Sequence, residues 1–394
     1  MAEPPLTVAW ISYFPVEWLP DGPPETRIPK QHPTSWLPSL AEEFSRRPAD
    51  LKLHVIVTRK HFPRDVTFDR GGVTYHCLKV QGGVRAPSLF WTDTLRIRQV
   101  VAAIRPDLIH AWGTEGGAAL IASRLGRPYL VSIQGLLGWF GTQAELGWYL
   151  RFMGVLEKFS LRRARMGTAE STFAVEHTRR HWPNLDMRRV EVVSGWEFHQ
   201  VQRRPQTERI RLFMVGALGS RKGGDMVARA FGELRQRLPL DLVVVGRPEA
   251  SCLDPVRAQL PPGTLEAIQF KPGLEQAQLM EEFARATIAV CPTRADTGPM
   301  FAKECVVAGV PLVGSRVAGI PDYVVPGRNG FLCEPGDAVG FTAALEQACT
   351  HPEFRHGRVD AEVQERLRRE LTPNASADGF LARYRETLAD YATR

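Results

Sequence analysis

Short runs of apolar, often β-branched residues alternate with helical segments along most of this chain. In the first half, the segments expected to be strands are 6–12, 52–58, 73–80, 107–112, 129–134 and 190–194. In the second half, they are 210–216, 241–246, 267–270, 286–292, 310–315 and 331–333. Strands that alternate with helices in this way are typical of βαβ units and parallel sheets. The sequence therefore predicts an α/β fold.

A polar stretch at 199–209 divides the 394 residues into two predicted Rossmann-like domains, 1–200 and 201–377. Each is long enough to bury a core of its own. The final segment, 378–394, is predicted to be a helix with one apolar face, which must pack against another part of the protein. The residues of this face are Leu381, Tyr384, Leu388 and Tyr391.

Composition argues against several classes of protein. The N-terminal residues lack the basic and apolar regions of a secretory signal, and no apolar run approaches the roughly 18 residues of a membrane span, so we expect a cytoplasmic protein. The six cysteines show no CxxC pair and no zinc-like spacing, so neither disulfides nor a metal site is expected. The formal charge of +7 comes with no zinc finger, RNP-like motif or basic helix, and nucleic acid is not an expected partner.

A glycine-rich turn follows the predicted strand 210–216. It begins at Gly216, contains Arg221 and Lys222, and precedes an apolar helix. Glycines allow the backbone to approach a ligand closely, a helix N-terminus carries partial positive charge, and the two basic side chains add donors. The turn is therefore a candidate phosphate-binding loop, although it lacks the P-loop pattern. The alternative is a solvated turn with basic side chains.

The stretch DTGPMFAKE contains two carboxylates, Asp296 and Glu304, in mostly apolar surroundings. Pro299 suits the first turn of a helix that runs to Gly309, so free backbone N–H groups near 298–301 can meet an anion or a hydroxyl. Glu304 lies on this helix, where an unpaired buried carboxylate is costly, and the vicinal diol of a ribose is a suitable partner. In the alternative interpretation, Asp296 only caps the helix and Glu304 pairs with an arginine.

Residues 286–337 resemble the donor-binding region of the GT4-type retaining glycosyltransferases. The hallmark of that family is an acid, seven residues and a glutamate, followed by a small-residue helix end and a G-x-P-V-like segment. Similar segments upstream extend the resemblance over most of the chain, though weakly before residue 100. The matching segments are 296–304, 308–313, 319–325, 327–332 and 335–337.

The resemblance implies the GT-B fold, with two Rossmann-like domains facing each other across a cleft and the C-terminal helix returning to the first domain. It implies a retaining, metal-independent transfer of a sugar from a UDP- or GDP-linked donor to a glycan, lipid-linked or small-molecule acceptor, with no further cofactor. Glu304 would hold the ribose and Lys222 the pyrophosphate, with Arg221 as our addition. The donor sugar would lie on Asp296, Thr297, Gly298, Pro299 and Met300, and the nucleotide base near Lys271 and Gly273, with Gly216 in the phosphate loop. Asp296, Lys222 and Glu304 are the predicted catalytic residues, whereas Lys271 is equally well explained as a surface residue.

The sequence departs from the family pattern at several positions. Ala217 stands where the family usually has an arginine, for which Arg221 or Arg316 is a possible substitute. Gln134 stands where a histidine is common, and Glu197 lies in a changed Asn-Gly-x-Asp segment before the linker. These departures keep open an inactive nucleotide-sugar-binding protein or a GT-B epimerase. A glycoside hydrolase with two carboxylates is disfavoured, because hydrolysis needs no phosphate loop.

Three residues are assigned to the acceptor side: His110, Gln134 and Glu197. For His110, at a predicted strand end, a structural hydrogen-bonding role is the favoured alternative. Glu115 opens a helix and either favours its dipole, which is the default, or contacts the acceptor.

The segment 135–165 combines aromatic and basic side chains. Such a segment can dock on an anionic bilayer, which would suit a lipid-linked acceptor. In the competing interpretation, its apolar residues at 149, 152, 153, 156 and 159 form one helix face packed on the sheet.

Overall fold

The computed structural model describes residues 4–30, 34–143, 147–205 and 208–393. The chain forms two compact units: Met1–Val193 together with Pro373–Arg394, and Ser194–Thr372. The predicted boundaries lay near residue 200 and between 377 and 378, a few residues later in the chain. None of the described helices combines the length and the apolar character that crossing a bilayer requires.

The first unit contains a sheet with the strand order β3-β4-β2-β1-β5-β6-β7-β8. All neighbours are parallel except β3, which pairs antiparallel with β4 at one edge. Side chains such as Val8, Ile109 and Val131 are fully buried in this sheet. The strands are β1 (Leu6–Ile11), β2 (Leu51–Arg59), β3 (Val66–Arg70), β4 (Val73–Lys79), β5 (Leu108–Trp112), β6 (Tyr129–Ile133), β7 (Met166–Ala169) and β8 (Asp186–Arg189).

One predicted strand of this unit is wrong. Residues 190–194 are not a strand, and the edge strand β8 ends just before them at Arg189. Val192 and Val193 are buried, which gave the segment its apolar pattern, but the chain here leaves the sheet edge. Residues that are buried but not paired with a neighbouring strand can therefore have the same apolar sequence pattern as a strand.

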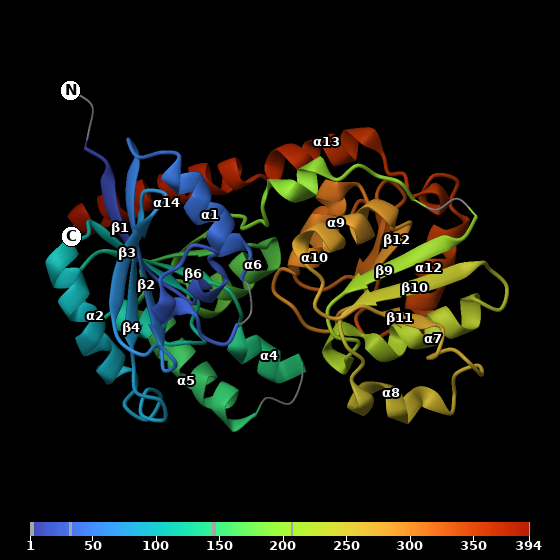
Figure 1. Cartoon of the computed structure of the whole chain (residues 1–394), viewed down its shortest axis with the longest axis horizontal. Helices are drawn as coiled ribbons and strands as arrows, with labels where there is room; N and C mark the ends of the chain where they lie inside the picture. Colours follow the sequence, from blue (N-terminus) through green and yellow to red (C-terminus); the bar gives the residue numbers. More distant parts are fainter. Residues whose placement is uncertain (1–3, 31–33, 144–146, 206–207, 394) are drawn as a thin grey trace. The chain divides into compact units, whose positions relative to one another are not determined.

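Helices cover both faces of the first sheet (Figure 1). The last helix of the chain, α14 (Pro373–Ala392), packs on α1 and on the sheet, whose residues are far from it in the sequence. Tyr384 is a large side chain of this helix with no exposed surface. The other helices are α1 (Trp36–Ser45), α2 (Trp91–Ile104), α3 (Ala118–Ala122), α4 (Leu137–Gln143), α5 (Trp148–Arg163) and α6 (Thr172–His181), with short 3-10 turns at Val16–Trp18 and Pro24–Thr26.

The second unit contains a fully parallel sheet with the order β11-β10-β9-β12-β13-β14. The chain runs outward from β9 in one direction and then returns to place β12 on the other side of β9. In open α/β sheets ligands bind beyond the carboxyl ends of the strands at such a reversal. The strands are β9 (Ile210–Val215), β10 (Leu240–Val245), β11 (Ile268–Phe270), β12 (Ile288–Cys291), β13 (Leu312–Ser315) and β14 (Gly330–Cys333).

The helices of the second unit bury apolar faces on this sheet, as Phe231 and Phe341 illustrate with at most 1% exposure. They are α7 (Gly224–Leu234), α8 (Ala250–Arg257), α9 (Gln276–Arg285), α10 (Met300–Ala308), α11 (Ile320–Tyr323), α12 (Ala338–Thr350) and α13 (Ala361–Glu370). Short 3-10 turns lie at η3 (Trp196–Gln200), η4 (Ser220–Lys222) and η5 (Phe354–His356). The loops that follow β9 and β12 are adjacent because these strands are neighbours.

Candidate functional site

The helix α10 begins directly after the DTGP segment. Pro299 is its N-cap, and no side chain caps its N-terminus, so the positive end of the helix dipole is open to a ligand. At the other end Gly309 adopts φ of 76°, a left-handed conformation that ends helices and favours glycine. The helix therefore has the predicted bounds, with its N-terminus beside Asp296.

Asp296 joins this helix end to the glycine-rich turn. The Nζ of Lys222 lies 2.6 Å from Asp296 Oδ2, and an Arg221 guanidinium nitrogen lies 3.4 Å from the same oxygen. The backbone N–H of Thr297 donates to Asp296 Oδ1 at 3.0 Å. Burial alone would raise the pKa of Asp296, but the charges of Lys222 and Arg221 outweigh it and hold that pKa below its usual range. The predicted phosphate-binding cation and the predicted sugar-binding acid thus form one ion pair.

Glycines let the turn after β9 approach the neighbouring strand ends. Gly223 has φ of 74°, and a Cβ at this position would lie 2.2 Å from the carbonyl oxygen of Pro292. Gly216 has φ of 121°, which also favours glycine. Any side chain at Gly223 would push the turn away from β12, and with it Lys222 from Asp296.

A second ion pair fixes the same turn, and sequence reasoning missed it. Arg294 forms two parallel hydrogen bonds to Asp225, both at 2.7 Å, and donates to the carbonyl of Ser220. The Arg294 backbone N–H also donates to the carbonyl of Arg221 at 2.8 Å. Bidentate pairs of this kind specify geometry as well as affinity. The available signal was an acid in the first turn of a helix and an arginine two residues before Asp296.

Glu304 has a hydroxyl partner in this structure. Ser194 Oγ donates to Glu304 Oε1 at 2.6 Å, and this serine was not among the predicted site residues. Burial is the main reason that the pKa of Glu304 rises to about 7; the Ser194 hydrogen bond opposes this rise, and the nearby Glu197 carboxylate adds to it. Among the described residues, no arginine forms an ion pair with Glu304, so the arginine alternative gains no support.

Glu197 was assigned to the acceptor side, yet it lies in η3 of the second unit, near Glu304. Lys271 was assigned to the nucleotide base, but its Nζ lies 2.6 Å from Glu282, which also pairs with Arg211 at 2.6 Å. Glu282 is only 5% exposed, so this arrangement supports a structural role for Lys271. The base-binding role of the loop around Gly273, which has φ of 72°, remains a prediction.

Arg316, a suggested substitute for the missing arginine at Ala217, instead pairs with Glu334 at 3.3 Å. Arg221, the other suggestion, lies at the site. No group of three or more potential metal ligands occurs in the part of the chain that the structure describes.

In the first unit, His110 is fully buried and both ring nitrogens have partners. Its Nδ1 lies 2.7 Å from Tyr384 Oη, and its Nε2 lies 2.6 Å from Ser132 Oγ. Burial lowers the pKa of His110 well below its ordinary value. The histidine therefore joins the C-terminal helix to the sheet, which is the structural alternative, and it has no surface with which to meet an acceptor.

The other first-unit residue, Gln134, lines a pocket of about 330 Å³ at the carboxyl ends of β1, β2, β5 and β6. Glu115 lies in the same pocket, where burial raises its pKa to about 7, and it accepts from the Thr114 N–H at 2.9 Å. Several lining residues lie at or directly after the ends of predicted strands, a signal that sequence reasoning used in this domain only for His110. The remaining lining residues are Tyr13, Thr34, Trp36, Leu37, Arg59 and Trp112.

Comparison with known proteins places each half of the chain in a described family. Residues 37–196 match the family described as "Glycosyl transferase 4-like domain", and residues 209–351 match "Glycosyl transferases group 1". The chain is 27% identical to a glycogen synthase of Mycobacterium tuberculosis over 66% of its own length and 64% of that protein. It is 30% identical to the D-inositol 3-phosphate glycosyltransferase of Streptomyces avermitilis over 45% of its own length.

These curated relatives are longer than the matched region, since the chain spans 64% of the glycogen synthase and 40% of the inositol-phosphate enzyme. Among solved structures, the sucrose-phosphate synthase of Thermosynechococcus elongatus superposes with a TM-score of 0.77 at 16% identity. The superposition covers 98% of this chain and 100% of that one, so the two share a fold.

Proposed function

We propose that this chain, which belongs to the group 1 glycosyl transferases, transfers a sugar from a nucleotide-diphosphate sugar to an acceptor. The membership and the fold shared with sucrose-phosphate synthase confirm the predicted GT-B fold. The observation that carries the proposal is the cluster of Lys222, Arg221 and Asp296 at the open N-terminus of α10. Relatives named as glycosyltransferases support a hexosyl group as the one transferred.

In this proposal the diphosphate binds to Lys222 and to the N-terminal amides of α10. The bound diphosphate replaces Asp296 as the partner of the Lys222 ammonium group. The Asp296 carboxylate then accepts hydrogen bonds from hydroxyls of the donor sugar. Fixed donors stabilise the charge that develops on the leaving diphosphate, and this is the largest contribution available to such a site. An oxygen of that diphosphate can accept the proton of the incoming hydroxyl on the same face, which gives retention without a separate protein base or a metal.

Glu304 and Ser194 are proposed to hold the nucleotide ribose, because a carboxylate and a hydroxyl together match a vicinal diol. The acceptor is proposed to bind in the aromatic pocket of the first unit. Aromatic faces such as Trp112 suit the C–H face of a sugar ring, while Glu115 and Gln134 can bond its hydroxyls. We propose a cytoplasmic location, where nucleotide sugars are made.

A nucleotide-sugar-binding protein without turnover is the second candidate, favoured by Ala217 and Gln134. An epimerase of the same fold is a variant of it. Release of nucleoside diphosphate only in the presence of an acceptor distinguishes transfer from both.

Replacing Glu304 by glutamine is expected to weaken donor binding by about tenfold to a hundredfold, because hydrogen bonds to a charged group contribute about 1.5–3 kcal/mol. Calorimetric titration with a panel of UDP- and GDP-sugars measures the change. Glu365→Gln is the matched control, since that side chain is 63% exposed on α13. Unchanged affinity in Glu304→Gln would reject the ribose assignment.

Donor binding is also expected to release protons near neutral pH. The Glu304 pKa of about 7 means that the carboxyl is half protonated there, and a bound diol favours the ionised form. Binding should then release about half a proton at pH 7, and affinity should rise with pH and level off above this pKa. Calorimetry in buffers of different ionisation enthalpy measures the release, which Glu304→Gln should remove. Release that persists unchanged in this variant would assign the proton to another group.

A further inference from the structure

The outward face of α5 carries large apolar side chains in contact with solvent. Trp148 is 80% exposed, Val155 49% and Phe159 48%. Basic side chains lie among them at spacings of three or four residues, so all belong to one face of the helix. The sequence interpretation that packs this segment on the sheet agrees with the burial of Met153 and Leu156 on the opposite face, but it is wrong for Phe159, which it also assigned to the packed face. The exposed basic residues are Arg151, Lys158, Arg162 and Arg163.

No acid balances these cations on α5. The only acid of the helix, Glu157, is 1% exposed and accepts hydrogen bonds from Thr114 Oγ1 and from the N–H groups of Leu137 and Gly138. Ion pairs of the described residues in this unit involve other arginines, and none joins Arg151 or Lys158 to a carboxylate. The face is therefore positive as well as apolar.

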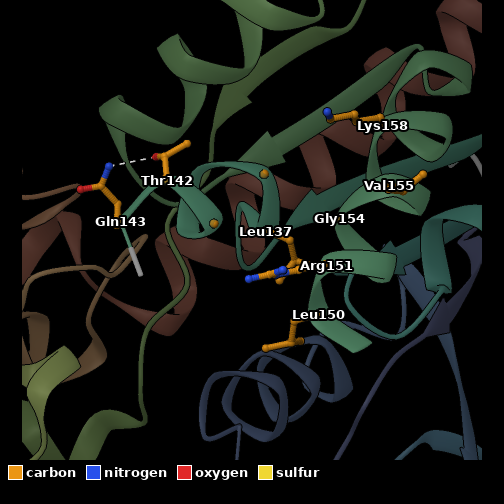
Figure 2. Close-up of a pocket in the computed structure, with 10 residues that line it drawn as sticks. Leu137, Thr142, Gln143, Leu150, Arg151, Gly154, Val155 and Lys158 are labelled. Carbon is orange, nitrogen blue, oxygen red and sulfur yellow. Dashed lines mark hydrogen bonds between the residues drawn. The ribbon is translucent and has the colours of Figure 1, made fainter. Parts of the chain in front are cut away.

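A groove of about 610 Å³ lies between α4 and α5 beside this face. Figure 2 shows Leu150, Arg151 and Lys158 extending from α5 toward the side on which α4 carries Thr142 and Gln143. Gly154 lines this groove, and a Cβ added there would lie 3.7 Å from the Leu137 side chain, which is an ordinary contact. One cation lies toward each end, because Arg151 and Lys158 are seven residues apart, or about 10 Å along the helix axis.

We propose that α5 and this groove form a docking surface for an anionic lipid bilayer, and that the groove takes a phospholipid headgroup phosphate between Arg151 and Lys158. A helix that presents basic and large apolar side chains together lies in the membrane interface, and tryptophan is enriched at that depth. Anionic headgroups provide negative charge opposite the basic side chains of α5, which the single, buried acid of that helix does not. A free phosphate ion would use the cations but leave Trp148, Val155 and Phe159 in water.

Co-sedimentation with vesicles tests the proposal on the whole chain. Binding is expected to vesicles with about one-third phosphatidylserine and not to pure phosphatidylcholine, and it should weaken as salt screens the charges. Arg151→Ala/Lys158→Ala should lower the partition coefficient about thirtyfold, since each basic residue near an anionic surface contributes about fivefold. Trp148→Ser should weaken binding at every salt concentration, because apolar insertion is not screened.

The matched control is Lys52→Ala/Lys79→Ala, which removes the same charge from exposed positions of β2 and β4. Equal loss in this control, or no binding of the unmodified protein to anionic vesicles at low salt, would overturn the proposal. So would full competition by millimolar inorganic phosphate combined with an unaltered Trp148→Ser variant, since the groove would then be a phosphate site only. The assay needs neither donor nor turnover, so its failure leaves the proposed transfer reaction untouched.

Discussion

Replacing Lys222 by methionine is expected to lower kcat by about a hundredfold to a thousandfold, the cost of removing one fixed donor from a developing charge. Methionine keeps the length and the apolar stem of lysine while removing the ammonium group that lies 2.6 Å from Asp296. The loss should appear mainly in kcat, because the diphosphate gains its full charge only as it leaves. Measurement of nucleoside diphosphate release at saturating donor gives the value.

Arg221→Met provides a graded comparison. Its guanidinium is 3.4 Å from Asp296 and its side chain is 56% exposed, so its loss should cost less than that of Lys222. A second readout does not depend on activity: without Lys222, the pKa of Asp296 should rise, and carboxyl NMR titration can follow it. An unchanged Asp296 titration, or equal kcat effects of both variants, would contradict the assigned roles.

Replacing Tyr384 by phenylalanine is expected to reduce the free energy that holds α14 on the first unit by about 2 to 4 kcal/mol, because it removes one oxygen that serves two buried groups. Tyr384 Oη accepts from Trp10 Nε1 at 3.1 Å and also lies at hydrogen-bond distance, 2.7 Å, from His110 Nδ1. Phenylalanine leaves the packing almost unchanged but removes the hydrogen-bond partner of Trp10 Nε1 and of His110 Nδ1.

Hydrogen exchange of the α14 amides measures this change, since local opening reports the stability of one element in a chain of two units. Tyr149→Phe is the control, because that ring is 39% exposed. Protection of α14 that stays equal in both variants would show that the buried hydroxyl does not stabilise the helix.

Most of the parallel strands were predictable because they are short apolar runs, and every strand of the second sheet was predicted. The strands that escaped prediction have weaker patterns for physical reasons. Strands β3 and β8 lie at sheet edges, where polar residues are tolerated, and β7 is four residues long with a glycine. Conversely, Val192 and Val193 led to a wrongly predicted strand. An apolar sequence pattern indicates that residues are buried, but it does not show whether they are hydrogen-bonded to a neighbouring strand.

The candidate site was predictable only in part. Asp296 and Lys222 stand in recognisable local patterns that follow strands, and their ion pair was within reach of that argument. Contacts between distant segments could not be predicted. Nothing in the local sequence indicates that Ser194 forms a hydrogen bond with Glu304, which lies 110 residues later. For His110 a structural hydrogen-bonding role was already the favoured interpretation, but its partner could not be predicted, because Tyr384 lies 274 residues away on the last helix.

The helix α14 makes the first unit discontinuous in the chain, whereas the second unit is one uninterrupted segment, Ser194–Thr372. During synthesis the second unit can therefore complete its core while its C-terminal neighbour is still inside the ribosome. The N-terminal sheet, by contrast, is incomplete until α14 has been synthesised. Until then, Trp10 and His110 lack the hydrogen bonds that they make to the Tyr384 hydroxyl. A chain that ends before Pro373 would therefore contain the whole of the second unit but a first unit that lacks its last helix.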